Sequence, residues 1–193
     1  MDYIGLINQM KTAGVRFADG LTEQEFDAIE QRFGFHFPPD FKQFLSLALP
    51  ISDKFINWRD NSAHNIERIR ERMNWCLEGM LTDVENNRFW MYEWGPKPSD
   101  LAEAKSICEV EYHTAPRLIP IYAHRYIPET PSEAGNPVLS VYQTDIIYYG
   151  ENLYEYLLVE FGFKKYEEIE FDNIKRIRFW SDIIDNWEAD YMI

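Results

Sequence analysis

The first 50 residues carry apolar side chains at the spacing of amphipathic helices. These side chains fall on one face in each of three segments, which predicts helices over 2–12, 22–33 and 38–49. Thr22 and Glu25 have the spacing of a capping box, and Gly34 follows the last turn of the second helix. Prolines open the third helix, where a missing backbone N–H costs nothing. The N-terminal part of the chain is therefore predicted to be helical.

Beyond residue 50, short runs alternate apolar and polar positions, as is typical of strands. These runs predict strands over 55–58, 117–122, 138–142 and 145–150. Two more runs, 81–85 and 88–92, flank Asn86-Asn87 and predict a hairpin. Pro120 places its strand at a sheet edge or a bulge. Helical spacing returns in four segments, which predicts helices over 65–74, 99–112, 152–161 and 173–187.

The chain of 193 residues contains no repeat, low-complexity stretch or linker that would divide it. Hydrophobic residues make up 46% of it, enough for one substantial core. We therefore predict a single α+β domain over residues 1–193, with a mostly antiparallel (mixed) sheet flanked by helices and with a helical N-terminus. The helix 173–187 is expected to pack on this domain.

Charge narrows the classes of partner. The chain has 33 acidic and 19 basic side chains, a net charge of −14. Because nucleic acids and anionic lipid surfaces are negatively charged, direct binding to either is disfavoured. A basic protein is favoured instead, and its association would slow as salt rises. Solubility alone also accounts for an acidic chain, so charge does not name the partner.

Two cysteines, Cys76 and Cys108, lack the spacing of a zinc site, and we expect both to be reduced and buried. The sequence pattern predicts no metal and no cofactor. The N-terminus shows neither the basic nor the apolar region of a signal peptide, and no stretch approaches the length of a membrane span. We therefore expect a cytoplasmic protein that does not enter a membrane.

Several segments in a fixed order resemble one known family. Residues 20–45 follow the pattern of Smi1/Knr4 (SUKH superfamily) domains: a capped helix, then Phe33-Gly34, Phe37-Pro38, Asp40-Phe41 and Phe44-Leu45. Residues 135–157 resemble the end of bacterial members, as do the shorter segments 58–60, 94–96 and 118–128. The resemblance spans residues 20–162. One difference is Ala48-Leu49-Pro50, where many family members carry Asn-Gly.

The resemblance implies an α+β fold with a sheet packed against helices, and a role without catalysis. Bacterial members are regarded as immunity proteins that bind and neutralise toxins, often nucleases. Fungal relatives act as regulators or scaffolds. The family has no established catalytic constellation, so no catalytic residue carries over to this chain. We therefore expect an antitoxin-like binding protein, with a regulatory scaffold that has several weak partners as the alternative.

A third interpretation is a small hydrolase or ligand-binding protein. His124, Arg125 and Asp145 would supply a base, an anion clamp and an orienting carboxylate, and His64 near Asp60 is a second candidate pair. The chain has no nucleophile elbow, P-loop, HExxH motif or glycine-rich phosphate loop. We therefore predict that it is not an enzyme. Arg125 and Asp145 are equally explained as a structural ion pair.

Two sets of residues are predicted to bind the partner. The first is acidic and lies in the C-terminal part: Glu167, Glu168, Glu170, Asp182 and Asp185. Such carboxylates can take the place of phosphate groups in a basic cleft. The second is a pair of aromatic anchors, Trp58 and Trp94, because tryptophan is enriched in interface hot spots. The alternatives are a solvated acidic face, and an Arg59–Asp60 neighbourhood that holds loops over an aromatic core.

Overall fold

The structure is a computed structural model that describes residues 1–186 of the chain. It is an α+β fold with a helical N-terminus, as predicted. The described part has seven α-helices: α1 (Tyr3–Thr12), α2 (Glu23–Phe33), α3 (Pro39–Leu47), α4 (Ala63–Glu85), α5 (Leu101–Thr114), α6 (Leu153–Glu160) and α7 (Trp180–Asn186). Short 3-10 helices are η1 (Tyr92–Trp94), η2 (Tyr166–Glu168) and η3 (Phe171–Asn173). Its strands are β1 (Phe17–Asp19), β2 (Ala48–Pro50), β3 (Leu118–Tyr122), β4 (Arg125–Pro128), β5 (Val138–Tyr142) and β6 (Asp145–Gly150).

Local sequence rules fix the N-terminal helices. The Thr22 hydroxyl accepts the backbone N–H of Glu25, and the Glu25 carboxylate accepts the N–H of Thr22 at 2.8 Å, so the capping box is formed. Gly34 ends α2 at φ +71°, a left-handed conformation that glycine adopts without strain. β1 and β2 pair antiparallel in a small sheet that the sequence pattern does not indicate, because each strand has only three residues.

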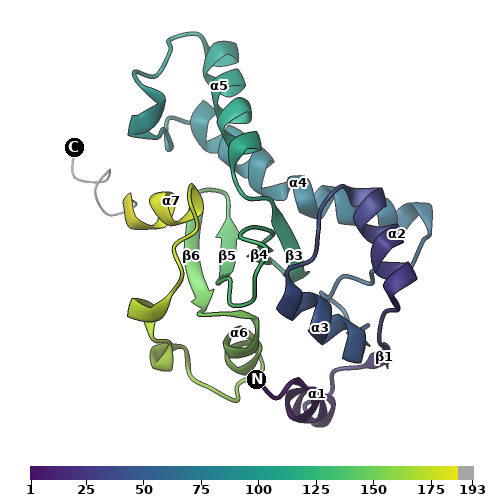
Figure 1. Ribbon diagram of the computed structural model, residues 1–193. Coiled ribbons are helices and arrows are strands. Elements are labelled where there is room, and N and C mark those ends of the chain that lie inside the picture. Colours follow the sequence, from purple (N-terminus) through teal and green to yellow (C-terminus); the bar gives the residue numbers. More distant parts are fainter. Residues whose placement is uncertain (187–193) are drawn as a thin grey trace.

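The main sheet is an antiparallel meander in the order β3-β4-β5-β6. Figure 1 shows the N-terminal helices beside β3 and the C-terminal segment beside β6. Tight turns join β3 to β4 and β5 to β6, and Ala123 and Gln143 have φ of 44° and 55° in them. The β3–β4 turn, Ala123-His124, contains neither Gly nor Asn. The sequence therefore gives no sign that β4 is a strand separate from β3. β3 is an edge strand with a register shift after Pro120, as the proline predicts.

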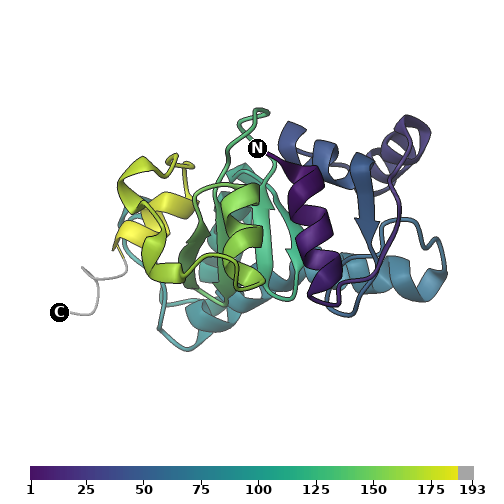
Figure 2. The same ribbon diagram turned by 90° about the horizontal axis from the view of Figure 1, so that it is seen from below.

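Both faces of the main sheet are covered, which creates two hydrophobic cores. Ile119 and Ile127 face the first core, which contains residues of α1, α2, α3 and α6. Leu139 and Val141 face the second core, which contains residues of α4, α5 and α7. Burial on both faces explains the near-continuous apolar runs in β3 and β4. Figure 2 shows the sheet from below, with α6 over one face.

The hairpin predicted around Asn86-Asn87 is wrong, because α4 continues through residue 85. Met80 and Val84 are one helical turn apart, and both are completely buried in the second core. Their spacing also fits the alternation of a strand. The helix forms because it packs both side chains against the main sheet. The strand predicted over 55–58 is reduced to one bridge with β3. The other predicted helices and strands up to residue 161 are confirmed to within a few residues, apart from α4, which extends the helix predicted over 65–74.

The helix predicted over 173–187 begins only at Trp180. Phe179 has φ +74°, which interrupts a right-handed helix, and its N–H bonds to the Asp182 carboxylate at 3.0 Å. α7 begins at the following residue, Trp180. Trp187, the end of the predicted helix, lies outside the described residues.

Candidate partner-binding surface

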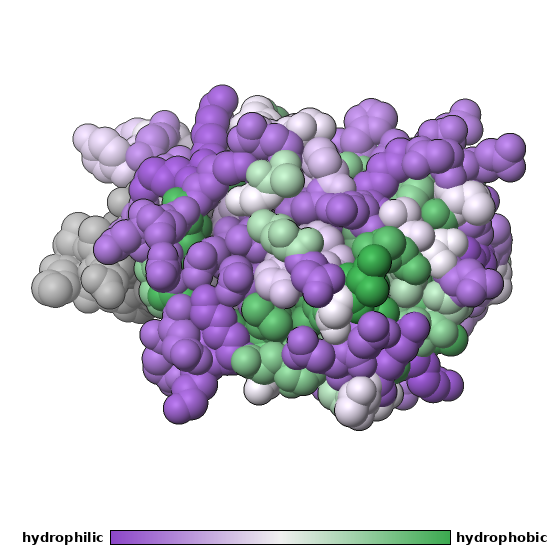
Figure 3. All heavy atoms as spheres, turned by 60° about the horizontal axis from the view of Figure 1, so that its bottom comes forward, coloured by the Kyte–Doolittle hydropathy of each residue, from purple (hydrophilic) through white to green (hydrophobic). Residues whose placement is uncertain are grey.

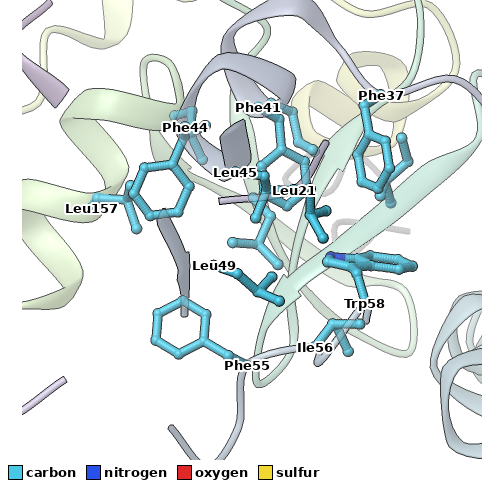
Figure 4. Close-up of a cluster of buried hydrophobic side chains, with 14 of the residues drawn as sticks. Leu21, Phe37, Phe41, Phe44, Leu45, Leu49, Phe55, Ile56, Trp58 and Leu157 are labelled. Carbon is cyan, nitrogen blue, oxygen red and sulfur yellow. The ribbon is translucent and has the colours of Figure 1, made fainter. Parts of the chain in front are cut away.

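Trp58 is a core residue. Its side chain is 2% exposed and packs edge-on against three rings, with centroid distances of 6.0 Å to Phe33, 5.6 Å to Phe35 and 5.2 Å to Phe37. Figure 4 shows the indole beside Phe37 in this cluster. Edge-to-face pairs of this kind stabilise a core beyond the area that they bury. The prediction of Trp58 as an exposed anchor is therefore corrected, since no partner reaches its ring.

Arg59 ties the end of β1 to the start of α2. Its guanidinium contacts both carboxylate oxygens of Glu25, at 2.5 and 3.1 Å, and donates to the carbonyls of Asp19 and Gly20 at 3.0 and 2.9 Å. This pairing lowers the pKa of Glu25 from 4.5 to about 2. The Asp60 carboxylate accepts the backbone N–H of Ser62 at 2.9 Å, in the turn that precedes α4. Arg59 and Asp60 thus hold loops over the aromatic core.

Arg125 is buried, and its partner is not the predicted Asp145. Its Nε lies 3.3 Å from Glu160 Oε2, its Nη1 donates to Ser140 at 2.9 Å, and its guanidinium lies 3.8 Å from the ring centre of Tyr149. Asp145 is exposed and makes no side-chain hydrogen bond or ion pair within residues 1–186. The predicted Arg125–Asp145 pair is therefore wrong, because α6 brings Glu160 to the guanidinium instead.

His124 lies at the tip of the β3–β4 turn and is exposed. Partial desolvation of its ring and the charge of Arg125 lower its pKa below 6.5, and the ring makes no hydrogen bond to a described residue. His64 likewise makes no hydrogen bond to Asp60 in the described part. The orienting contacts that a catalytic base needs are thus not formed at either histidine within residues 1–186. In the same range, no three metal-ligating side chains gather, and no helix is long and apolar enough to cross a membrane.

The acidic residues between 167 and 185 fall into two groups. Asp182 and Asp185 both pair with Arg176, the first at 3.0 Å, so that their charge is partly compensated. The second group is exposed and forms no ion pair within residues 1–186: Glu167, Glu168, Glu170 and Asp172. Uncompensated charge of one sign attracts a partner of the other. The second group is therefore the stronger candidate for binding a basic protein.

Exposed apolar side chains occur in the same segment of the chain and on the neighbouring strand β6. Phe171 is 47% exposed, Phe163 38% and Ile147, on β6, 41%. Phe171 and Ile147 also line a groove of about 460 Å³, together with Tyr148, Tyr166, Ile146, Ile184 and Asp185. Figure 3 shows one face of the molecule, on which hydrophilic side chains surround separate apolar areas. We call Phe163, Phe171, Ile147 and the four unpaired carboxylates the acidic-aromatic surface.

The groove lies at the outer edge of β6. β6 is the last strand of the meander, so this edge has no strand partner among the described residues. The Tyr166 hydroxyl donates to the Tyr148 carbonyl there, at 3.0 Å. Ile146 turns its backbone N–H and C=O toward the same edge, because backbone groups alternate along a strand. The edge therefore offers main-chain hydrogen bonds next to an apolar groove.

Trp94 is half-buried in the loop that follows α4. Its ring stands edge-on to Trp90 at 5.1 Å and to Phe89 at 5.4 Å. It does not line the groove at β6. Its ring also stacks on Phe179 at 6.5 Å, and the Phe179 N–H binds Asp182. The structure therefore brings Trp94 near Asp182, but not into the groove at β6.

Sequence reasoning missed the exposed aromatic residues of the acidic-aromatic surface. Alternation over 167–172 would place Ile169 and Phe171 on the same face of a strand. The segment forms η2 and η3 instead, so that Ile169 is 5% exposed and Phe171 47%. The available sequence signal is a lone aromatic residue with an acid on each side, Glu170 and Asp172.

Comparison of the chain with protein-family models, with curated proteins and with solved structures found no match in any of the three. The resemblance of residues 20–162 to Smi1/Knr4 domains therefore stays a prediction.

Proposed function

We propose that this protein is a cytoplasmic, non-enzymatic binding module that captures a basic partner protein through the acidic-aromatic surface. One observation carries the proposal: four exposed carboxylates have no ion-pair partner in residues 1–186, and they adjoin in sequence Tyr166 and Phe171, which line the groove at β6. Unpaired acids speed and orient the approach of a basic protein. Exposed aromatic residues then supply the apolar contact that holds it.

The edge of β6 suggests how a partner is held. An extended basic segment would add to the sheet at Ile146 and place apolar side chains in the groove beside Phe171. Its lysines or arginines would meet Glu167, Glu168 and Glu170. Main-chain hydrogen bonds supply affinity in this mode, and the side-chain contacts supply specificity.

The Smi1/Knr4 resemblance gives the proposal a biological form. Bacterial proteins of that type are regarded as immunity proteins, so the basic partner would be a toxin such as a nuclease. A nuclease binds phosphates with positive side chains, and a cluster of carboxylates competes for those side chains. A regulatory scaffold with several weak partners is the alternative that the same resemblance allows.

Affinity capture with three forms of the protein tests this function. The first is the natural chain. The second reverses three charges of the surface (Glu167→Lys, Glu168→Lys and Glu170→Lys). The third, a control with the same change in net charge, reverses three other exposed acids (Glu78→Lys, Glu93→Lys and Glu109→Lys). Each is exposed to lysate of the source organism at low and at high salt.

One basic protein that the natural chain and the control capture, and that the surface variant loses, is the expected result. Purification of that protein then gives a dissociation constant for each form, which we expect to rise at least about tenfold only in the surface variant. Equal binding by the surface variant would refute the placement of the surface. Many proteins held weakly would favour the scaffold.

A further inference from the structure

A second charged region of the molecule is basic. Lys54, Arg68 and Arg72 line a cavity of about 180 Å³ between α4 and the loop that precedes it. None of the three forms an ion pair with a residue in the range 1–186. Glu71 is the one carboxylate that lines the cavity, and it too forms no ion pair in that range. Three unpaired cations thus gather in a chain whose net charge is −14.

The fold holds these cations together. Arg68 and Arg72 are four residues apart on α4, so they lie on one face of the helix. Lys54 comes from the loop, and its carbonyl accepts the Ala123 N–H at 3.0 Å, which ties the loop to the tip of the β3–β4 hairpin. The apolar lining of the cavity is buried and consists of Phe55, Ile56 and Ile69. The basic side chains therefore surround an apolar floor.

Arg72 has an unused donor. Its Nη2 is buried and has no hydrogen-bond partner among the described residues. The guanidinium lies 5.9 Å from the ring centre of Tyr126, whose hydroxyl donates to the Arg72 carbonyl at 2.9 Å. A buried donor on a charged group is costly to leave without an acceptor. An anion in the cavity would offset the repulsion between the three cations.

We propose that the cavity between Lys54, Arg68 and Arg72 binds a phosphate group, as free phosphate or as the phosphomonoester of a larger molecule. Two arginines and a lysine from two elements would surround the anion, a donor set suited to a charged tetrahedral group. The cavity is smaller than the roughly 300–1,000 Å³ of pockets that enclose a whole small molecule, so it fits a single oxyanion group. This site is independent of the acidic-aromatic surface.

The pKa of His124 can be used to detect an anion in the cavity. Partial desolvation of the ring lowers this pKa, and the positive charges of Arg125, Arg72 and Lys54 lower it further. A dianion next to Arg72 and Lys54 opposes those charges. We therefore expect the pKa of His124, followed by NMR, to rise when the cavity is saturated.

Calorimetric titration of the full chain at low salt tests the site, with inorganic phosphate, phenyl phosphate and acetate as probes. We expect Arg72→Gln and Lys54→Gln each to weaken phosphate binding by about tenfold. Arg70→Gln is the matched control, because Arg70 is on the same helix, is exposed and pairs with Glu67 at 3.7 Å. Lys54 is also exposed, so Lys54→Gln keeps the test valid if Arg72→Gln fails to fold.

Tighter binding of phenyl phosphate than of phosphate would support the site and point to a phosphomonoester, and equal binding would support it and point to free phosphate. Absence of phosphate binding in the low millimolar range would overturn the proposal. So would equal affinity for acetate, or an equal loss in Arg70→Gln, because either result means a diffuse charge effect. An unchanged pKa of His124 at saturation would also overturn it, since the anion would then lie elsewhere.

Discussion

The segment 58–60 and the segment 163–172 have similar chemistry and opposite environments. Both combine aromatic rings with charged side chains. In the first, Trp58 is 2% exposed and the Arg59 guanidinium has four hydrogen bonds to protein acceptors. In the second, Phe171 is 47% exposed, and Glu167 has no ion-pair partner in residues 1–186. The polar and aromatic groups of the first segment are satisfied by contacts within the protein. The second segment has exposed groups that a partner could contact.

The comparison shows that residue type alone does not separate a hot spot from a structural clamp. Tryptophan and arginine are enriched at interfaces, and for that reason the first segment draws attention in the sequence. Yet interface energy comes from groups that are free before binding and covered afterwards. Glu167, Asp172 and the exposed rings of the second segment meet that condition. Glu168 and Glu170 accept hydrogen bonds from the Lys165 N–H and from Asn173 but pair with no cation in residues 1–186. Trp58 and Arg59 do not meet the condition.

The largest expected effect concerns the two rings. Trp58→Ala should lower the free energy of unfolding by about 3–5 kcal/mol, because it leaves a cavity in the first core. Phe171→Ala should lower it by less than about 1 kcal/mol, because much of its side chain is already in solvent. Urea unfolding of both variants measures the difference. Similar losses in the two would show that the segments do not differ as described.

A smaller effect is expected at the Arg59–Glu25 pair. The pKa of Glu25 is lowered to about 2, so the pair contributes stability above pH 4.5 and loses it as the pH falls toward 2. Glu25→Gln should cost about 1 kcal/mol near neutral pH, a modest value because the pair is partly solvated. Below the folded pKa that cost should disappear. Urea unfolding of the natural chain and the variant across this pH range checks it.

Glu23→Gln is the control for that experiment. Glu23 lies in the same turn of α2 and pairs with Lys42, but its side chain is 77% exposed. Its replacement should change stability little at any pH. A pH-independent cost of Glu25→Gln would mean that the carboxylate charge is not what Arg59 stabilises.

The smallest effect is expected in the acidic segment itself. Glu167→Gln combined with Glu170→Gln should change the free energy of unfolding by less than about 0.5 kcal/mol. No ion pair within residues 1–186 is lost, and the amide oxygen of Gln at position 170 can still accept the hydrogen bond from Asn173. The same double variant should weaken capture of a basic partner. Thermal unfolding and a binding titration together measure this. A loss of stability above about 1 kcal/mol would assign these carboxylates to the fold.

Local features of the fold were predictable from the sequence. The capping box at Thr22, the stop at Gly34 and the strands over 138–142 and 145–150 all depend on residues within one or two turns of each other. The spacing of apolar residues before Asn86-Asn87 led to the wrong prediction of a hairpin, because it fits a strand and a helix equally well. Burial of Met80 and Val84 against the sheet resolved that ambiguity.

The candidate sites depended on contacts between distant parts of the chain. The sequence by itself determined the boundaries of the three N-terminal helices, the α+β class and the acidic balance, since these follow from local hydrogen bonding and composition. Tertiary structure alone decided that Arg59 pairs with Glu25, 34 residues away, and that Arg125 pairs with Glu160 and not with Asp145. It also left one group of acids and one group of cations unpaired. Pairing is a property of positions in space, and sequence spacing sets those positions only within a helical turn or a strand pair.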